Sequence, residues 1–596
     1  MTEQRGGLGW PASAAVASTA TAAALLVMFW TRSAFQIRTL PERVMEWALL
    51  FVSPDALEAG IGRFGFEAKV YALYAAVGGM ALILIGVGTV VLAKARSPWT
   101  LWALGPALYL FAMAVIMPVT GAGLFASELF QDPWLVNACY LGIAFSYASL
   151  LLLGKSLLGG RASGATRALR PPPGLGMARR AFIAGLAPAI GSYVAIFWLG
   201  QRTGAAGSSV PLAKVPSLAS AAPPTAAPAA TAYRPSNEQA AAALPTPAPQ
   251  PTMEPAKPSG PASEPPLPVP KPMNKQLTRD KDGSLTAGSR QPGTLAPLIT
   301  RAQDHYHVTK NPVADPVIKP EEWRLVLDGE LKNPVQLDYR TLRQLPAVET
   351  AKTLECISNL TAECQLVPFG CELIGTARWK GVPLKDLIGL AGGFKPGVVS
   401  VALLGSDEFV SVIPAEVALD PNTLVAYEMD GDVLPYEHGY PARVLTPGRY
   451  GFKSAKWVIA IRPMNREVLD WYGQRNWSKD GIVKTMTRID VPAPAAGLPA
   501  GSQRIAGIAY AADRGIGKVE FSANGGQTWE PATFLEPAPG KDAWVRWEGT
   551  FELAARATAK LVARATDGTG TLQTEQFSLA QPEGASGWNH IEVRSQ

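Results

Sequence analysis

The chain has 596 residues, of which 48% are hydrophobic, and a formal net charge of +6. This length is too great for one core and predicts roughly three or four domains. Four cysteines exclude a disulfide scaffold, the lack of a Cys-x-x-Cys pair excludes zinc ribbons and haem c attachment, and the lack of a basic patch with interleaved aromatics argues against nucleic-acid binding.

The first 200 residues contain five apolar segments, each close to the length of about 20 residues that a membrane-spanning helix needs. Segments this long without charges are rare in soluble domains, so we prefer spanning helices to a buried helical core. A shorter apolar stretch within residues 41–65 is broken by Ser53-Pro54-Asp55 and predicts an interfacial helix. Residues 1–202 are therefore expected to form an all-α transmembrane bundle of five helices, at residues 12–30, 68–92, 99–120, 134–154 and 181–200.

The loops between these segments differ in charge, and an excess of Lys and Arg marks the cytoplasmic side. Lys94 and Arg96 follow the second segment, whereas the loop after the third carries acidic residues only. Basic residues also follow the fourth segment, namely Lys155, Arg161, Arg167, Arg170, Arg179 and Arg180. The N-terminus is thus predicted inside the cytoplasmic membrane and everything after Gly200 on its periplasmic or extracellular side. The pair Arg179-Arg180 either resembles a twin-arginine export signal or is simply part of this flanking charge.

Residues 203–295 are dominated by Ala, Pro, Ser and Thr, as in Ala221-Ala222-Pro223-Pro224. Such a composition cannot bury enough apolar surface to offset the entropy lost on ordering. We expect a disordered, partly polyproline linker between the anchor and the domains that follow.

Regular structure is expected again over residues 296–492, where short strands alternate irregularly with short helices. One helix is expected to begin at Asp338 or Tyr339, and another to end at Gly392-Gly393. This mixture indicates an α+β domain. Strands are predicted at residues 323–329, 353–357, 398–404 and 408–413, the last two paired around a turn.

Cys356 ends one of these strands and allows three interpretations. It is a buried core residue, a thiolate ligand of a redox metal, or a nucleophile that needs a His base. The candidate bases are His305, His307 and His438. Spacing alone does not choose among the three.

Four motifs of this domain stand in a characteristic order and spacing. They are Leu354-Glu355-Cys356-Ile357-Ser358-Asn359, Ala377-Arg378-Trp379-Lys380-Gly381-Val382-Pro383-Leu384, His438-Gly439-Tyr440-Pro441-Ala442-Arg443, and Pro447-Gly448-Arg449-Tyr450-Gly451-Phe452 with Ser454-Ala455-Lys456-Trp457. With them, the chain from about residue 305 to about residue 490 resembles the sulfite oxidase superfamily of molybdopterin enzymes. The anchor and the tail are similar to the membrane-bound bacterial branch of that family.

The resemblance implies that one cysteine thiolate ligates molybdenum beside a single molybdopterin, and Cys356 occupies that position. It also implies Cys356, Asn359 and Arg378 as catalytic residues. A phosphate favours Arg, Lys and backbone N–H donors, although Arg443 and Lys456 taken alone would be read as solvated surface charges. By motif, the pterin and its phosphate would be held by Tyr306, His307, Cys356, His438, Arg443, Ser454, Ala455 and Lys456.

The sequence departs from the family's pattern just after the cysteine. Sulfite oxidases place Gly-Asn and arginines there to bind the oxyanion, whereas this chain has Ser358-Asn359-Leu360-Thr361 and no arginine before Arg378. Sulfite is therefore in doubt as the substrate. A short insertion carries Cys364 and Cys371, which we expect to form a disulfide outside the cytoplasm if the geometry permits; alternatively one of them is redox-active.

Residues 493–596 change to short alternating strands, with a hairpin signal at Asn524-Gly525-Gly526. We expect an immunoglobulin-like β-sandwich here. It resembles the dimerisation domain of sulfite oxidases, so a homodimer is expected and no chemistry is assigned to this domain.

Together these features predict a membrane-anchored molybdenum-cofactor oxidoreductase that transfers an oxygen atom on a small substrate, such as sulfite, an S-oxide or an N-oxide, outside the cytoplasm. The alternatives are a cofactor-free binding module on the same fold and a Cys-dependent hydrolase. No histidine precedes His305, so the helices cannot bind haem through paired histidines. A separate electron carrier is therefore expected, either a cytochrome or a membrane redox subunit.

Overall fold

The computed structural model describes residues 8–52, 60, 63–64, 68–95, 97–127, 129, 132–159, 265–271, 278–279, 285–286, 291–311, 315–364 and 370–596. Within them, four helices are long and apolar enough to cross a membrane. They match the first four predicted segments to within a few residues, and the fifth, residues 181–200, lies outside the described residues together with Arg179 and Arg180. The four are α1 (Trp10–Phe35), α4 (Ala68–Lys94), the run α5 (Pro98–Phe111), η3 (Ala112–Ile116) and α6 (Met117–Val119), and α7 (Pro133–Gly159).

These helices approach one another through small residues. Ala17, Ala20 and Ala24 of α1 are buried in one cluster with residues of α4 and α7. A Cβ on Gly154 of α7 would lie 2.2 Å from a methyl group of Val16 on α1, so only glycine permits this crossing. Close backbone contact therefore stabilises the bundle where large side chains could not fit.

The stretch within residues 41–65 does contain a short helix, α2 (Leu40–Ala48), which continues as the 3-10 turn η1 (Leu49–Phe51). Thr39 and Glu42 form a capping box at its start: the Thr39 hydroxyl accepts from the Glu42 N–H, and the Glu42 carboxylate accepts from the Thr39 N–H at 2.7 Å. Residues 53–59 lie outside the described residues. The helix packs against the domain that follows the linker rather than standing alone.

Two five-stranded sheets build the domain expected at residues 296–492, and they share one core with the buried indoles of Trp323, Trp379 and Trp457. The first sheet has the order β10-β9-β6-β5, with β11 against β9. Its strands are β5 (Val348–Glu355), β6 (Ile374–Pro383), β9 (Leu424–Met429), β10 (Asp432–Val433) and β11 (Arg443–Leu445). All pairs in this sheet are antiparallel.

The second sheet has the order β4-β3-β12-β7-β8, in which only β3 and β12 run parallel. The expected hairpin is present as β7 and β8. The helix expected at Asp338 or Tyr339 has Asp338 as its N-cap, since that carboxylate accepts from the Thr341 N–H at 2.7 Å. The strands are β3 (Arg324–Leu327), β4 (Val335–Asp338), β7 (Ser400–Gly405), β8 (Val410–Pro414) and β12 (Val458–Met464), and the helices are α9 (Tyr339–Gln344), α10 (Leu384–Leu390) and α11 (Ala415–Ala418).

Two further sheets form the C-terminal β domain around Phe521, Trp547 and Leu561. One sheet has the order β13-β15-β19-β18 and the other β14-β21-β20-β16-β17. The predicted turn at residues 524–526 follows β16, which pairs with β17. The strands are β13 (Met486–Val491), β14 (Gly497–Leu498), β15 (Gly501–Tyr510), β16 (Ile516–Ser522), β17 (Glu530–Pro531), β18 (Thr533–Phe534), β19 (Val545–Leu553), β20 (Thr558–Asp567) and β21 (Asn589–Ser595).

The structure differs from the sequence prediction near two expected domain boundaries. The strand β13 (Met486–Val491) lies before the predicted boundary at residue 493 and pairs with β15 of the C-terminal β domain. Residues 265–271, expected within the disordered linker 203–295, are extended and packed: the Tyr440 hydroxyl donates to the Pro268 carbonyl at 2.7 Å, and Leu267 contacts the core. Proline lacks a donor but keeps its carbonyl acceptor, so this stretch can bind the domain surface. Two-residue strands β1 (Thr278–Arg279) and β2 (Leu285–Thr286) also pair there.

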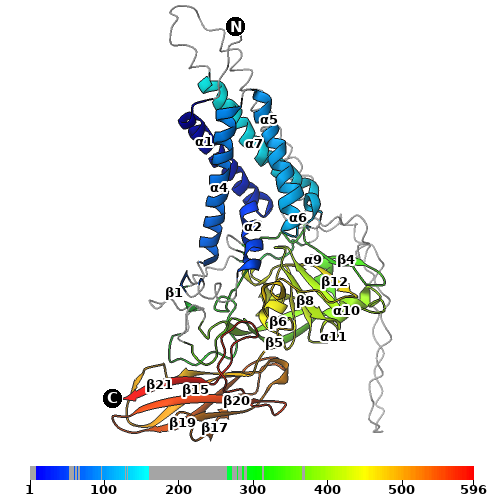
Figure 1. Ribbon diagram of the computed structural model, residues 1–596. Helices are drawn as coiled ribbons and strands as arrows, with labels where there is room; N and C mark the ends of the chain where they lie inside the picture. The colour runs from blue at the N-terminus through cyan, green and yellow to red at the C-terminus, as the bar shows by residue number, and fades with distance from the viewer. Residues whose placement is uncertain are drawn as a thin grey trace, which may run out of the picture.

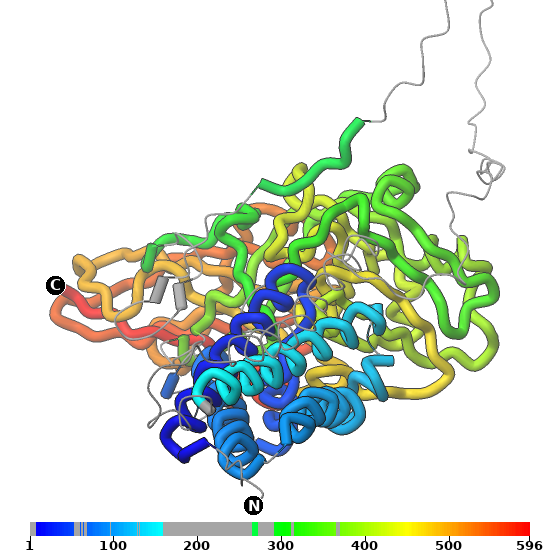
Figure 2. Tube along the Cα trace, turned by 90° about the horizontal axis from the view of Figure 1, so that it is seen from above, coloured from blue at the N-terminus to red at the C-terminus, as the bar shows by residue number. Residues whose placement is uncertain are grey.

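The helices, the middle domain and the C-terminal β domain follow one another along the molecule (Figure 1). Seen from above, the helices lie over the middle domain and the β domain extends to one side (Figure 2). The middle and C-terminal domains share a buried contact in which Lys352 pairs with Asp542 and the Tyr510 hydroxyl donates to the Thr353 carbonyl at 3.0 Å.

Candidate active site

Cys356 stands at the first position after β5, where the strand delivers it into a loop. Its N–H donates to the Leu373 carbonyl at 2.9 Å, and the residue is 7% exposed. Burial raises the pKa of the Cys356 thiol, while hydrogen bonds from Ser358 act in the opposite direction. A nearby positive charge, such as a metal ion, would favour the thiolate form of this thiol.

The pocket beside Cys356 collects most of the predicted cofactor-binding residues from distant parts of the chain. The segment before β3, the end of β5, the turn η6 (Tyr436–His438), β11 and the stretch after η7 (Gly451–Lys453) all contribute. The predicted residues that line it are Tyr306, His307, Cys356, His438, Arg443, Ser454 and Lys456.

Arg443 is the most informative of them, because its guanidinium is buried without an acidic partner among the described residues. Its Nη1 donates to the His438 carbonyl and its Nη2 to the Ser454 carbonyl, both at 3.1 Å. Its Nε is buried with no hydrogen-bond partner in the described part of the chain, and burial lowers the pKa of Arg443 to about 10. The guanidinium also lies 5.2 Å from the centre of the Trp379 ring, and a buried cation with neutral neighbours of this kind fits a bound anion such as a phosphate.

The two histidines of the pocket are oriented by neighbouring acceptors. His438 Nε2 lies 2.9 Å from the Ala302 carbonyl, so this nitrogen carries the proton and donates. His307 Nε2 lies 2.7 Å from the Asp315 carboxylate. Burial alone would raise the pKa of Asp315, but the hydrogen bond from His307 and the charge of Lys456 hold it below its usual value. The imidazoles are therefore fixed in orientation before any ligand arrives.

Close packing around Tyr306 shows why glycine follows the tyrosine of the fourth motif. A Cβ on Gly451 would lie 2.5 Å from the Tyr306 hydroxyl. On the far side, the Lys456 ammonium donates to the Glu437 carbonyl at 2.9 Å and lies 4.2 Å from the centre of the Trp457 ring. The motif residues thus shape the pocket as well as line it.

Three predicted residues do not line the pocket. Arg378 is exposed on β6 between the buried Ala377 and Trp379, because alternate residues of a strand face opposite sides, and its catalytic role stays a prediction. Asn359 instead holds the loop after Cys356: its Nδ2 donates to Glu355 at 2.9 Å and its Oδ1 accepts from the Leu373 N–H at 3.0 Å. Ala455 is buried and its carbonyl accepts from the Val444 N–H.

Several pocket residues were not predicted from the sequence. Asp407, buried and with its pKa raised by that burial, accepts from the Asn311 side chain at 3.2 Å. No motif marks such residues, since a polar residue in a turn signals burial only when the fold is known. The unpredicted lining residues include Lys310, Asp407, Phe409 and Tyr472, and His305, considered only as a candidate base, lines the pocket as well.

The insertion after Cys356 is closed by a disulfide between Cys364 and Cys371, as expected. Cys139 and Cys356 are the free cysteines of the described chain. No group of three His, Cys, Asp or Glu side chains able to hold a metal occurs within the described ranges.

The chain is similar in sequence to proteins of known function. Residues 311–472 match the family model described as oxidoreductase molybdopterin binding domain. Over 309 residues the chain is 29% identical to sulfite oxidase of Gallus gallus, covering 45% of this chain and 67% of that protein. It is 27% identical to the NADH nitrate reductase of Solanum lycopersicum, covering 48% of this chain but only 38% of the relative. The sulfane dehydrogenase SoxCD of Paracoccus pantotrophus aligns at 23% identity and a TM-score of 0.45, covering 51% of this chain and 82% of that one.

Proposed function

We propose, from the premise that this chain belongs to the sulfite oxidase superfamily and is a molybdenum-dependent oxidoreductase, that it transfers an oxygen atom on a small substrate at an extracytoplasmic site. The observation that carries this proposal is the pocket itself. It places a buried thiol, Cys356, beside a buried guanidinium, Arg443, that has no acidic partner among the described residues.

The donor set of the pocket fits Mo-molybdopterin. The Cys356 sulfur would ligate the metal, and Arg443 and Lys456 would hold the phosphate. Tyr306, His438 and the other polar lining residues offer the mixed donors and acceptors that a pterin edge needs. When bound, the cofactor supplies a two-electron redox change coupled to oxygen-atom transfer, while the protein orients the substrate and limits the entry of water.

The arrangement of the helices supports a periplasmic or extracellular catalytic domain on a cytoplasmic-membrane anchor. Gln36, after α1, donates to the Val317 carbonyl at 2.6 Å, and Lys69, at the start of α4, contacts Thr309, so these helix ends meet the catalytic domain. At the opposite ends, Lys155 donates to the Ala95 carbonyl near Lys94. The loop residues Lys94 and Lys155 therefore lie at the ends away from the catalytic domain, which supports an outside site under the positive-inside rule.

Substrate, electron carrier and oligomeric state belong to the same proposal. Sulfite, an S-oxide or an N-oxide would each suit oxygen-atom transfer, in either redox direction. Electrons would pass to or from a separate cytochrome or membrane redox subunit, because no histidine precedes His305. The C-terminal β domain, proposed as immunoglobulin-like, would pair two copies of the chain.

The first test is the molybdenum and pterin content of the full chain, purified in detergent from a host that makes the cofactor. We expect about one molybdenum and one pterin per chain, with molybdenum reduced in Cys356→Ser and unchanged in the matched thiol variant Cys139→Ser. A well-folded chain with neither metal nor pterin would leave a cofactor-free binding module or a Cys-dependent hydrolase.

A further inference from the structure

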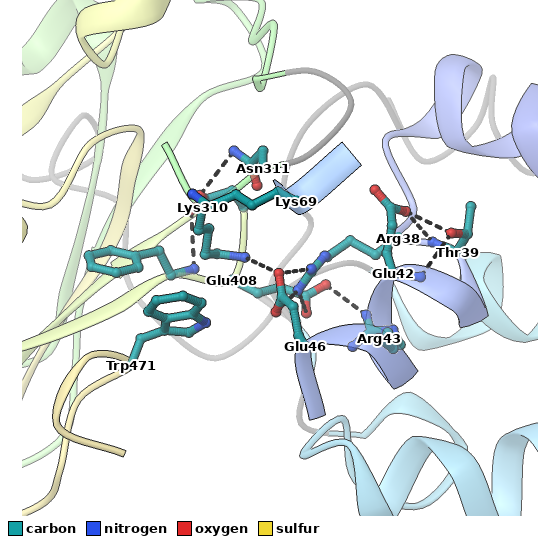
Figure 3. A network of polar contacts seen from close by, with 12 residues as sticks. Arg38, Thr39, Glu42, Arg43, Glu46, Lys69, Lys310, Asn311, Glu408 and Trp471 are labelled. Atoms are coloured by element: carbon teal, nitrogen blue, oxygen red, sulfur yellow. Dashed lines mark hydrogen bonds and ion pairs between the residues drawn. The ribbon is translucent and has the colours of Figure 1, made fainter. Parts of the chain in front are cut away.

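The membrane anchor and the catalytic domain meet in a cluster of charged side chains. Arg43 of α2 donates to Glu408 at 2.7 Å, and Glu46 of the same helix pairs with Lys310 at 3.5 Å. Arg38, just before α2, donates to Glu46 at 2.8 Å and lies 3.7 Å from Glu408. Figure 3 shows these residues of α2 facing Lys310 and Glu408 across the junction.

This charge cluster is shielded from water. The side chains of Arg43 and Lys310 are 3% and 2% exposed, and that of Glu408 is 14% exposed. Removal of one partner of an ion pair at such burial is strongly destabilising, because the other charge is left buried and uncompensated. The anchor is thus bound to the catalytic domain by specific pairs rather than lying near it by chance.

The partners on the catalytic side belong to the segments that form one side of the pocket. Lys310 lines the pocket, and Glu408 stands between two lining residues, Asp407 and Phe409. Arg475, close to the lining residue Tyr472, donates to the Glu46 carbonyl at 3.3 Å. The anchor therefore contacts three of the segments that shape the space around Cys356.

Lys69 extends this contact to the lining of the pocket. It stands in the first turn of α4, is half-buried, and its ammonium donates to the carbonyl of the lining residue Thr309 at 2.6 Å. A membrane helix thus brings an amino group against the segment that lines the pocket.

We propose that the anchor completes the catalytic pocket: α2 holds the segments on one side of it in place, and Lys69 supplies a positive charge that favours small anions. Arg43, Glu46 and Lys69 are then positioning residues of the site, although they belong to the anchor. We rest this on the proposed function only in taking the pocket around Cys356 as the catalytic one. A substrate with a negative charge and small size, such as an oxyanion, fits this wall better than a neutral or bulky one.

Alkylation of Cys356 tests the proposal without requiring the cofactor. The full chain carrying Cys139→Ser would be made in a host that lacks molybdopterin, so that Cys356 is the free thiol. Its rates of reaction with neutral iodoacetamide and anionic iodoacetate would be compared by mass spectrometry. With either reagent a carbon–sulfur bond forms, the carbon–iodine bond breaks, iodide leaves and the thiol proton passes to the buffer.

Substitutions at Lys69 test whether its positive charge acts in the pocket. We expect Lys69→Met to lower the ratio of the iodoacetate rate to the iodoacetamide rate by about tenfold, as removal of one nearby unit charge in a partly shielded site predicts. Lys69→Arg should keep the ratio. Because the ratio cancels any change in the amount of thiolate, an unchanged ratio in Lys69→Met would overturn the role of Lys69.

Substitutions at Arg43 test whether the contact between α2 and the catalytic domain keeps the pocket closed. Arg43→Glu should raise both alkylation rates by about tenfold or more, because opposing the Glu408 charge detaches α2 and opens the pocket. Arg43→Lys, which keeps the charge, should behave like the parent. Unchanged rates in an Arg43→Glu protein with a native near-ultraviolet spectrum would show that the pocket is complete without the anchor. Since no rate depends on molybdenum, these outcomes stand apart from those of the metal-content test.

Discussion

Removing the Arg443 guanidinium should separate cofactor binding from folding. Burial that lowers the pKa of Arg443 to about 10 corresponds to about 3 kcal/mol by which the folded, cofactor-free chain disfavours this charge. In Arg443→Met that penalty disappears, while the carbonyls of His438 and Ser454 lose a donor each, at about 1–3 kcal/mol apiece. The two effects largely offset each other, so the cofactor-free chain should change in stability by about 3 kcal/mol or less.

The cofactor-loaded chain should respond very differently to Arg443→Met. Hydrogen bonds to a charged group contribute about 1.5–3 kcal/mol each, so the loss of a guanidinium–phosphate contact should weaken cofactor binding by about ten- to a hundredfold or more. Pterin retained through gel filtration measures this, and urea unfolding of the cofactor-free chain measures stability. Arg378→Met, at an exposed arginine, is the matched control and should change neither. A stability loss of several kcal/mol with full pterin retention would show that Arg443 is a structural residue.

Three further substitutions test the charges and the cross-link around the site. Because the pKa of Asp315 is depressed, its contribution to stability is present above about pH 4 and is lost as pH falls. Asp315→Asn should therefore destabilise the chain near neutral pH and have the same stability as the parent in acid. Unfolding curves at several pH values would show this. Lys352→Met should cost about 3–5 kcal/mol by stranding the buried Asp542, and adding Asp542→Leu should recover much of it; equal losses in the single and double variants would contradict a coupled pair. Replacing Cys364 and Cys371 together by serine should cost about 2–3 kcal/mol, the value for so short a loop, and a chain of undiminished stability would refute this.

Much of the architecture was predictable because its signals are local. Segment length and hydropathy predict the first four helices, and the capping side chain of Asp338 predicts the start of α9. The disulfide between Cys364 and Cys371 was expected from their short separation and the predicted extracytoplasmic location. Each of these features depends on residues close together in the chain.

The site was predictable only where motifs carry it. Cys356, His438 and Arg443 stand in such motifs, and the structure brings them to one pocket. Arg378 also stands in a motif, but the alternation of β6 turns its side chain outward, and the exact face of a strand was not assigned from sequence.

Other features depend on contacts across long distances in the chain. Lys69 and Thr309 meet only because the helical anchor folds back onto the catalytic domain. The packing of residues 265–271 depends in the same way on distant residues, because Tyr440 and Arg340 donate to carbonyls of this segment. Composition describes such segments as linker or anchor, and only tertiary structure shows that they bind the domain.

X-ray absorption at the molybdenum edge of the purified full chain tests the central claim most directly. We predict that the native chain shows one more sulfur ligand to molybdenum than Cys356→Ser, while Cys139→Ser matches the native spectrum. A molybdenum site whose sulfur ligation is the same in the native chain and in Cys356→Ser would contradict the assignment of Cys356 as the metal ligand and, with it, the account of the pocket given above.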